Sequence, residues 1–317
     1  MTISAQPLVS IVIPCYNQGR FLAEAIESAQ RQTHPHIEIV VVDDGSTDQT
    51  ATITQRYSAV TCVAQSNAGA AAARNAGLEK SRGEHVIFLD ADDRLLPHAA
   101  ALGVDYLSVY QDRAFVSGHV RLIAEDGSDR GVPPQIHAEG GGYRELLLEN
   151  YIWTPGAVMY RRSALELVGG FDPAAGGSAD FELNLRLARR FAYGCHHQVV
   201  LEYRRHSMST SADAAGMLRS AVTVRRRQRR FIRGDRSATD AWRRGIATVQ
   251  ADFGGRVVEQ IASDLVQRHM FNAVRGLRCL LAYHRAGLWQ LVRASLRRLS
   301  KASSRPAMTR EQVARRG

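Results

Sequence analysis

Apolar runs and amphipathic stretches alternate along the first 90 residues of the chain. The runs typical of buried strands are residues 8–17, 37–46, 59–66 and 84–90. The stretches typical of helices are residues 19–32, 47–58 and 68–81, and Ser46 or Thr47 is expected to cap the second of them. Strands and helices that alternate in this way predict an α/β fold built on a doubly wound, mostly parallel sheet.

The pattern is less regular after residue 104. It predicts a hairpin at 115–132, a loop rich in Pro and Gly at 133–142, a strand and helix at 151–173, and a well-buried helix at 179–191. Beyond Ser211 the apolar spacing indicates helices throughout, including one over 288–300. We therefore expect three parts: a sheet domain over 1–211, a helical region over 212–302 and a disordered tail over 303–317.

Charge divides the chain at the same place. Residues 212–317 carry 23 Lys and Arg against 7 Asp and Glu, whereas residues 1–211 carry 18 against 24, so the net charge of +10 conceals two halves of opposite sign. An Arg-rich run at 225–230 predicts a polyanionic partner. Phe271 and Trp289 on amphipathic helices favour an anionic membrane surface, and nucleic acid is disfavoured because no recognition module is present.

Targeting signals and disulfide patterns are missing from the sequence. The N-terminal segment lacks the pattern of a signal peptide, and no apolar run approaches the roughly 20 residues that span a bilayer. The expected location is the cytoplasm, with peripheral attachment to the inner face of the membrane. The cysteines are isolated in sequence and are expected to be ordinary buried thiols: Cys15, Cys62, Cys195 and Cys279.

Acidic and amide side chains follow three of the predicted strands. Asn17 follows the first, Asp43 and Asp44 the second, and Asp90, Asp92 and Asp93 the fourth. The carboxyl ends of parallel strands meet at one edge of a sheet, which is where ligands bind in such folds. Three acids within four residues repel one another unless a cation joins them. Asp93 is interpreted as a capping or turn residue.

An ordered series of motifs resembles the family 2 glycosyltransferases, inverting enzymes of the GT-A fold. The motifs are "VSIVIPCYNQGRFLAEAIESAQRQT", "IEIVVVDDGSTDQT", "NAGAAAARNAGLEKSRGEHVIFLDADDRLLP" and "GAVMYRRSALELVGGFD". The resemblance covers roughly residues 8–210 and leaves out the C-terminal third. It implies that residues 1–211 form a catalytic domain that binds a nucleotide-diphosphate sugar. The donor is expected to be a UDP-sugar and the acceptor a glycan or a lipid-linked molecule.

The resemblance also assigns roles to the polar clusters. Asp90-Ala91-Asp92 is similar to the DxD motif, in which the second acid binds Mn²⁺ or Mg²⁺ and the first lies near the ribose. Asp43 is favoured as a nucleotide contact, with Asp44 as the second choice, and His206 is expected to bind the metal or the diphosphate. The expected substrate-binding residues are Pro14, Tyr16, Asn17, Asp43, Asp44, Arg74, Asp90, Ala91 and Asp92.

Inversion at the sugar carbon requires a base that takes the proton of the acceptor hydroxyl. In the family an acidic pair that opens a helix after "GGFD" supplies it. Here Ala179 stands where Glu is usual, and Asp180 occupies the position of the base. Asp180 is therefore the expected catalytic residue, and Glu182 is the fallback.

Other protein classes use acids at strand ends. A phosphoreceiver domain needs a lysine soon after its phosphorylated Asp, yet the chain has lysines only at 80 and 301. A haloacid-type phosphatase carries its DxD motif on the first strand, whereas three strands precede this one. A nucleotidyltransferase, or a module of the same fold that binds nucleotide sugars without turnover, stays open as the alternative.

Overall fold

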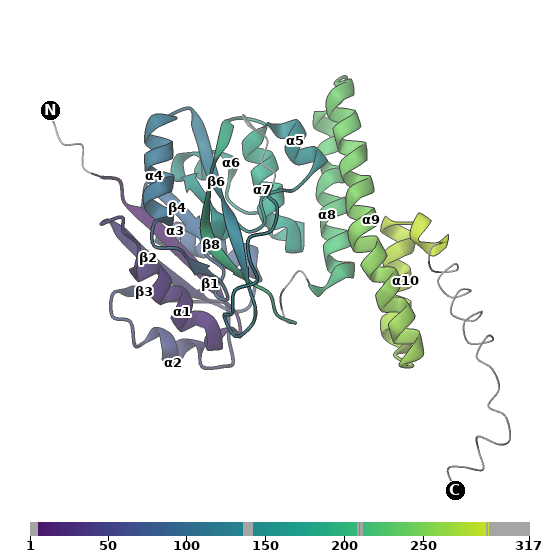
Figure 1. Ribbon diagram of the computed structural model, residues 1–317, viewed down its shortest axis with the longest axis horizontal. Coiled ribbons are helices and arrows are strands. Elements are labelled where there is room, and N and C mark those ends of the chain that lie inside the picture. Colours follow the sequence, from purple (N-terminus) through teal and green to yellow (C-terminus); the bar gives the residue numbers. More distant parts are fainter. Residues whose placement is uncertain (1–5, 136–141, 208, 210–211, 290, 292–317) are drawn as a thin grey trace, which may run out of the picture. The chain divides into compact units, whose positions relative to one another are not determined.

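The computed structural model describes residues 6–135, 142–207, 209, 212–289 and 291. The predicted alternation of strands and helices is present at the N-terminal end (Figure 1). Its elements are β1 (Val9–Cys15), α1 (Gly19–Gln30), β2 (Ile37–Asp43), α2 (Thr50–Thr54), β3 (Val60–Ala64), α3 (Ala70–Lys80) and β4 (His85–Phe88). Strand β1 pairs in parallel with both β2 and β4, and β2 pairs in parallel with β3. The ends of these four strands therefore share one edge.

The rest of the sheet is mixed. Its elements are β5 (Arg94–Leu95), α4 (Ala99–Val109), β6 (Arg113–Ile123), α5 (Tyr143–Leu148), η1 (Pro155–Ala157), β7 (Val158–Arg161), α6 (Arg162–Val168), η2 (Pro173–Ser178), α7 (Ala179–Ala188) and β8 (Ala192–Arg204). The strand order is β3-β2-β1-β4-β7-β6-β8-β5, with β7 antiparallel to both β4 and β6. The structure confirms the predicted α/β class, although β8 had no counterpart in the prediction, because polar residues at 195–198 interrupt its apolar pattern.

Each face of the sheet carries its own core, as the alternation of side chains along a strand requires. Val12 of β1 belongs to the cluster shared with helices α3, α5, α6 and α7. Its neighbours Ile11 and Ile13 belong to the cluster on the other face, with α1 and α4. Helix α3 packs closely because Gly77 faces Val12, where a Cβ atom would collide with the valine side chain. This close packing carries the start of α3 to the strand ends.

The predicted cap of α2 is wrong. The helix begins at Thr50, where the Asp48 carboxylate accepts the Thr50 N–H at 3.0 Å. The Ser46 hydroxyl instead accepts the N–H of Asn17 at 3.0 Å, and Thr47 donates its own N–H to the Asn17 side chain. Both residues link the loop after β2 to the loop after β1, so neither is available to the helix.

Two other expectations are corrected in part. The chain turns back at Asp126-Gly127 as predicted, but among the described residues the return arm forms one bridge, between Ile123 and Asp129, in place of a second strand. The prediction of four buried thiols is confirmed for Cys15 alone. Cys195 and Cys279 are half-buried, and Cys62 is exposed because β3 lies at the edge of the sheet. Cys15 is buried, and burial raises the pKa of its thiol to about 11.

The C-terminal part is helical, as predicted, with α8 (Ala214–Gln228), η4 (Arg229–Phe231), α9 (Arg236–Val266) and α10 (Met270–Tyr283). Contacts divide the chain into two units, 1–212 with 223–245, and 213–222 with 246–317. This division differs from the boundary expected after Ser211, because Val224, Ile232 and Ala238 belong to a core of the sheet unit.

The second unit has a core of its own, formed by Leu218, Val222, Val257, Ile261 and Leu280. Within the described part of the chain, every helix is too short or too polar to cross a membrane. The tail over 303–317, most of the predicted loop over 133–142 and most of the predicted helix over 288–300 lie outside the described residues; residues 288, 289 and 291 are helical.

Candidate functional site

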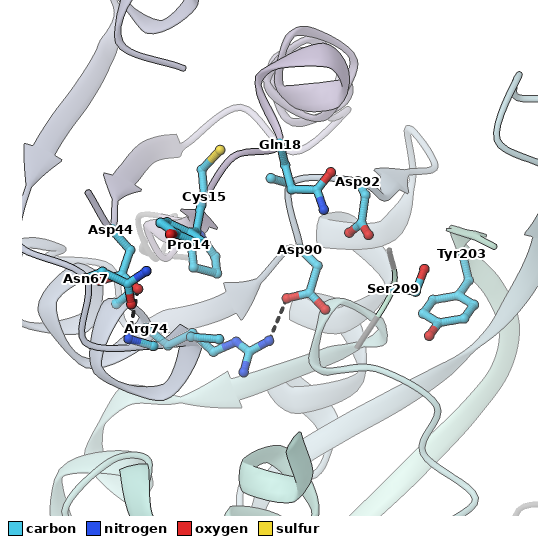
Figure 2. A pocket seen from close by; sticks show the side chains of 15 residues that line it. Pro14, Cys15, Gln18, Asp44, Asn67, Arg74, Asp90, Asp92, Tyr203 and Ser209 are labelled. Atoms are coloured by element: carbon cyan, nitrogen blue, oxygen red, sulfur yellow. Dashed lines mark hydrogen bonds and ion pairs between the residues drawn. The ribbon is translucent and has the colours of Figure 1, made fainter. Parts of the chain in front are cut away.

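A pocket of about 430 Å³ opens where β1, β2 and β4 end (Figure 2). The residues that line it are Pro14, Cys15, Tyr16, Gln18, Asp44, Asn67, Gly69, Ala70, Ala73, Arg74, Asp90, Ala91, Asp92, Tyr203 and Ser209. Seven of the residues predicted to bind substrate are among them. Asn17, Asp43, Asp180 and His206 are not among the lining residues. The shared sheet edge therefore gathers acids that lie far apart in the sequence.

Arg74 and Asp90 form an ion pair in the wall of the pocket (Figure 2). An Arg74 guanidinium nitrogen lies 2.6 Å from Asp90 Oδ1, and Thr154 donates a long 3.4 Å hydrogen bond to Oδ2. Burial alone would lower the pKa of Arg74, but the charges of Asp90 and Asp180 raise it further than burial lowers it. The buried Nε of Arg74 has no hydrogen-bond partner among the described residues. Arg74 is thus a fixed cation in the wall of the pocket, held by Asp90.

Asp92 lies beside His206. The imidazole Nε2 is 2.8 Å from Asp92 Oδ2, the histidine side chain is fully buried, and its ring contacts Phe21. Burial and the charge of Asp90 raise the pKa of the Asp92 carboxyl, and His206 offsets part of that rise. The structure therefore brings together the two residues predicted to bind a metal.

The turn that carries the DxD motif is fastened to the end of β8. Buried Asp93 accepts the backbone N–H of Arg204 at 2.8 Å, and the Arg204 guanidinium donates to the backbone oxygen of Asp92 at 2.8 Å. A second nitrogen of Arg204 pairs with Glu24 of α1 at 2.7 Å. The backbone N–H of Asp93 closes the turn by donating to the Asp90 oxygen at 3.0 Å, and Arg204 holds Asp92 in place.

Asp44 connects the end of β2 to the start of α3. Its Oδ1 accepts hydrogen bonds from the Gln65 amide and the Ala68 N–H, and its Oδ2 accepts the Gly69 N–H. These contacts position the first turn of α3, which carries Ala70 and Ala73 into the pocket wall. A carboxylate offers about four acceptor sites, so one remains for a ligand.

Replacing Asp44 with alanine is expected to lower the free energy of unfolding by about 1–3 kcal/mol, because the Ala68 and Gly69 N–H groups lose their acceptor. Urea titration followed by circular dichroism measures the change. The control is Asp105→Ala, which removes an exposed acid from α4 and should alter stability by less than about 0.5 kcal/mol. Equal effects of the two substitutions would show that Asp44 does not hold the loop.

Asn17 and Asp43 link the loops that follow β1 and β2. Asn17 has a left-handed backbone conformation, φ 52°, and its side-chain oxygen accepts the Thr47 N–H at 2.8 Å. Asp43 is buried, and its carboxylate accepts the Ser46 N–H at 2.9 Å. Both side chains shape the rim that carries Tyr16, which is 47% exposed.

Asp180 lies in the first turn of α7, close enough to Arg74 and Asp90 for their charges to affect it. Burial raises the pKa of its carboxyl, and Arg74 limits the rise. Glu182, the fallback for the same role, is buried and is held by Arg186 through contacts of 2.7 to 2.9 Å. Glu182 is thus committed to a salt bridge, whereas the Asp180 carboxylate forms none with any other described residue.

Several pocket residues were not predicted from the sequence. Gln18, Asn67, Tyr203 and Ser209 line the cavity, and Trp153 packs edge-on against Tyr203 with ring centroids 6.4 Å apart. The segment "YRRHS" contained a signal, since Tyr203 and Arg204 stand next to the predicted His206. The Arg204 partners Asp92 and Asp93 lie more than 100 residues away in the sequence, so only the fold reveals them.

Comparison with known proteins identifies the family of the chain. The sequence model described as glycosyl transferase family 2 matches residues 10–169. An uncharacterised glycosyltransferase of Nostoc sp. is 36% identical over 178 residues, which cover 52% of this chain and 54% of that protein. A putative teichuronic acid biosynthesis glycosyltransferase of Bacillus subtilis is 35% identical over 128 residues, which cover 39% and 50%. The chain thus spans about half the length of these two curated relatives. An uncharacterised glycosyltransferase of Rickettsia typhi is 30% identical over 217 residues, covering 67% and 68%.

Solved structures agree on the fold. The S. aureus protein TarS, residues 1–349 in complex with UDP, matches with a TM-score of 0.60 and 19% identity, covering 78% of this chain and 72% of that one. The mannosyltransferase PcManGT from Pyrobaculum calidifontis, in complex with GDP-Man and Mn²⁺, matches with a TM-score of 0.58 and 19% identity, covering 90% and 88%. At these identities the likeness concerns the fold alone.

Proposed function

We propose, since the chain belongs to glycosyl transferase family 2, that it transfers a sugar from a nucleotide-diphosphate donor to an acceptor hydroxyl with inversion at the sugar carbon. The proposed donor is a UDP-sugar, and the proposed acceptor is a glycan or a lipid-linked molecule. One observation carries the proposal: a single pocket is lined by the Arg74–Asp90 pair and by Asp92, whose carboxylate contacts His206.

The charges of the pocket favour a donor that arrives with a cation. Asp44, Asp90 and Asp92 contribute three carboxylates against the single guanidinium of Arg74. A diphosphate alone would meet repulsion there, whereas a diphosphate with a divalent cation would not. Support for a nucleotide contact comes from the free acceptor site of Asp44, which suits a base N–H or a ribose hydroxyl.

The residues beside Asp92 fit a divalent cation. Adjacent ligands in an octahedral site around Mg²⁺ lie about 3 Å apart, and Asp92 Oδ2 and His206 Nε2 are separated by 2.8 Å. In this proposal Asp92 and His206 hold Mn²⁺ or Mg²⁺. When bound, such an ion neutralises the charge that develops on the departing diphosphate. Arg204 keeps the backbone of Asp92 fixed meanwhile.

Asp180 is the proposed base. Asp180 lies in the first turn of α7, close enough to Arg74 to be affected by its charge. Its carboxylate would accept the proton of the acceptor hydroxyl as that oxygen attacks the sugar carbon. The aromatic wall formed by Trp153 and Tyr203 is the proposed acceptor side, because a sugar ring has apolar C–H faces that pack on aromatic rings. Trp153 is 37% exposed and therefore accessible to an acceptor.

Product analysis tests the proposed reaction. The full chain, Mn²⁺ and a panel of nucleotide sugars are incubated with glycan and lipid-linked acceptors, and both nucleoside diphosphate and pyrophosphate are measured. Release of nucleoside diphosphate with a β-linked product from an α-linked donor supports the proposal. Release of pyrophosphate would identify a nucleotidyltransferase, and tight binding with neither product would indicate a module without turnover.

As the pH is lowered, the activity is expected to fall at a higher pH than it would with an ordinary aspartate as the base. Burial raises the pKa of Asp180, so protonation should inactivate the base at a pH above the usual value of about 4. The pH profile of kcat/KM should therefore show an acidic limb above that value. Because Arg74 lowers the pKa of Asp180, Arg74→Met should move the limb of the residual activity to higher pH. A limb that stays at about 4 in both proteins would contradict the role of Asp180.

Helix α10 supports the proposed membrane contact. Met270, Val274, Leu277 and Leu281 recur at helical spacing and are 37% to 58% exposed, while Phe271 beside them is 82% exposed. The other face, with Ala273, Gly276 and Leu280, is buried in the core of the second unit. The exposed arginines on and beside α10 are Arg268, Arg275, Arg278 and Arg285. An apolar stripe with basic neighbours fits the surface of an anionic bilayer, here the cytoplasmic face of the membrane.

The double substitution Met270→Glu with Phe271→Glu is expected to reduce retention on anionic liposomes at least about tenfold, because two side chains lose their apolar burial. Sedimentation of the full chain with liposomes measures this. Leu167→Glu, at an apolar residue of α6 that is 64% exposed, is the matched control and should leave retention unchanged. Unchanged retention of the double variant would contradict the proposal. Dissociation of a dimer in that variant would assign the stripe to a second copy of the chain.

A further inference from the structure

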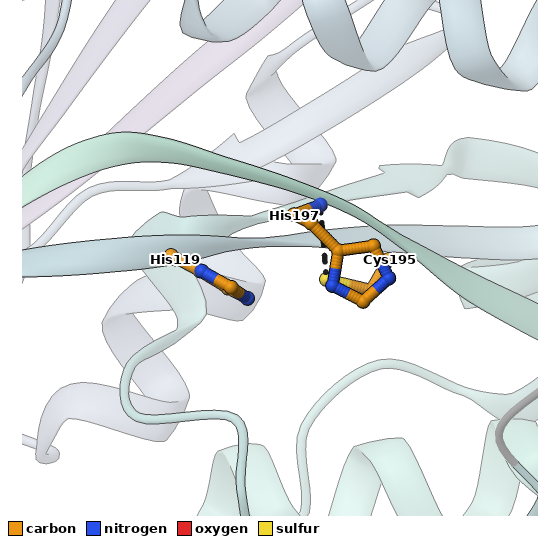
Figure 3. A group of neighbouring side chains, drawn as sticks. All are labelled: His119, Cys195 and His197. Carbon is orange, nitrogen blue, oxygen red and sulfur yellow. Dashed lines mark hydrogen bonds between the residues drawn. The ribbon is translucent and has the colours of Figure 1, made fainter. Parts of the chain in front are cut away.

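A second cluster of metal-ligating side chains lies in the middle of strands β6 and β8. His119 comes from β6, and Cys195 and His197 come from β8 (Figure 3). One ligand atom of each residue lies within 4.8 Å of those of the other two. None of the three residues lines the pocket that holds Asp92. The proposed sugar transfer does not use the cluster.

An irregularity in β8 brings these side chains together. Ser117 pairs with Cys195, whereas His119, two residues later on β6, pairs with Val199, four residues later on β8. The extra residues form a bulge in which His197 has a left-handed backbone conformation, φ 57°. The N–H of His197 donates to Cys195 Sγ at 3.3 Å. Bulges of this kind re-aim side chains, and left-handed residues other than glycine are concentrated at functional sites.

The two histidine rings of the cluster lie close together. The His119 and His197 rings meet edge to face, with centroids 5.5 Å apart. Around a tetrahedral Zn²⁺, nitrogen ligands at about 2.0–2.1 Å and sulfur at about 2.3 Å are separated from one another by roughly 3.5 Å. The ligand atoms of the cluster lie within 4.8 Å of one another, so a bound cation would draw them closer by rotation of the side chains.

We propose that His119, Cys195 and His197 bind one divalent cation of the zinc class. Two imidazole nitrogens and a thiolate are the borderline-soft ligands that Zn²⁺ and Co²⁺ prefer, in contrast to the oxygen-rich DxD site, which suits Mn²⁺ or Mg²⁺. Three protein ligands leave a fourth position for water. The cation joins β6 to the bulge of β8, the strand whose end holds the DxD turn through Arg204.

The three side chains must be in the forms that bind a metal. Each histidine binds as neutral imidazole, through the lone pair of one ring nitrogen. The cysteine binds as thiolate, so the Cys195 thiol releases its proton to solvent when the sulfur–metal bond forms.

Cobalt spectroscopy tests the site. The tag-free full chain is freed of metal with a chelator and titrated with Co²⁺, and the near-ultraviolet band of thiolate-to-Co²⁺ charge transfer is recorded. The band reports a cysteine ligand, so Co²⁺ at Asp92 and His206 does not contribute to it. We expect a band that saturates at one ion per chain and disappears when Zn²⁺ is added.

Variants assign the band to residues. Cys195→Ser should abolish it, and His119→Gln should weaken Co²⁺ binding at least about tenfold while the band remains detectable. Cys62→Ser, which removes the exposed thiol of β3, is the matched control and should leave the titration unchanged. Circular dichroism verifies that each variant is folded, and the wild-type titration stands independently of them. Absence of the band in the wild type, or its persistence in Cys195→Ser, would overturn the proposal.

Discussion

Replacing Asp180 with asparagine is expected to lower kcat for sugar transfer by about 10²–10⁴-fold and to leave the affinity for the donor unchanged. The substitution keeps the size of the side chain and removes the group that accepts the proton. Asp180 is not among the residues lining the donor pocket, and it is affected electrostatically by Arg74 and Asp90. Loss of the base should therefore slow the chemical step without weakening the nucleotide complex.

Glu182→Gln is the matched control for this prediction. Glu182 lies in the same helix, but its carboxylate is buried against Arg186, whose guanidinium also donates to the backbone oxygens of Val168 and Gly170. The control should lower stability and retain most of the kcat. Initial rates at saturating donor, together with calorimetric titration of the nucleotide, separate the two variants. A Glu182→Gln enzyme as slow as Asp180→Asn would contradict the assignment of the base.

Replacing Asp92 with asparagine is expected to abolish the dependence of nucleotide binding on Mn²⁺ and to lower activity by on the order of 10³-fold, because several kcal/mol of charge stabilisation depend on the metal. The amide cannot replace the anionic ligand, although it preserves the shape of the turn. His206 alone should hold the ion poorly. Calorimetric titration of a nucleoside diphosphate, with and without Mn²⁺, measures the effect.

Asp93→Asn is the control in the same turn. Burial, together with the charges of Asp92 and Asp90, raises the pKa of Asp93 well above its ordinary value, so the native side chain already tends toward the neutral form. An asparagine retains an oxygen to accept the Arg204 N–H. This variant should bind Mn²⁺ and nucleotide as the wild type does. If both variants lost Mn²⁺-dependent binding equally, Asp92 would not be distinguished as the ligand.

The sequence predicted the N-terminal fold well because its signals are local. Runs such as residues 9–15 and 39–43 are buried on both faces of the sheet, and consecutive apolar residues in the sequence indicate such burial. Strand β8 was missed because "GCHHQ" interrupts its apolar pattern at the bulge. There the strand is stabilised by its pairing with β6 and not by local propensity. The cap of α2 was wrongly predicted because Ser46 bonds to Asn17, 29 residues away.

The residues that line the candidate site were largely predictable from the sequence, for the same reason as the N-terminal strands. Acids that directly follow a predicted strand can be recognised from the sequence. Seven of the nine residues expected to bind substrate line one pocket. The positioning residues were not predictable in this way. Arg204 holds a turn 111 residues earlier in the sequence, and Asp44 holds the loop before α3. The roles of such residues depend on which loops the sheet brings together, and this information is not contained in local spacing.

The central claim is that this sheet edge holds a divalent ion and a sugar diphosphate in one pocket. A crystal structure of the full chain with Mn²⁺ and UDP tests it most directly through the anomalous signal of the metal. We predict a Mn²⁺ peak within coordination distance of Asp92 and His206, with the diphosphate bound between that peak and Arg74. A metal peak away from Asp92, or a nucleotide bound outside this pocket, would contradict the account.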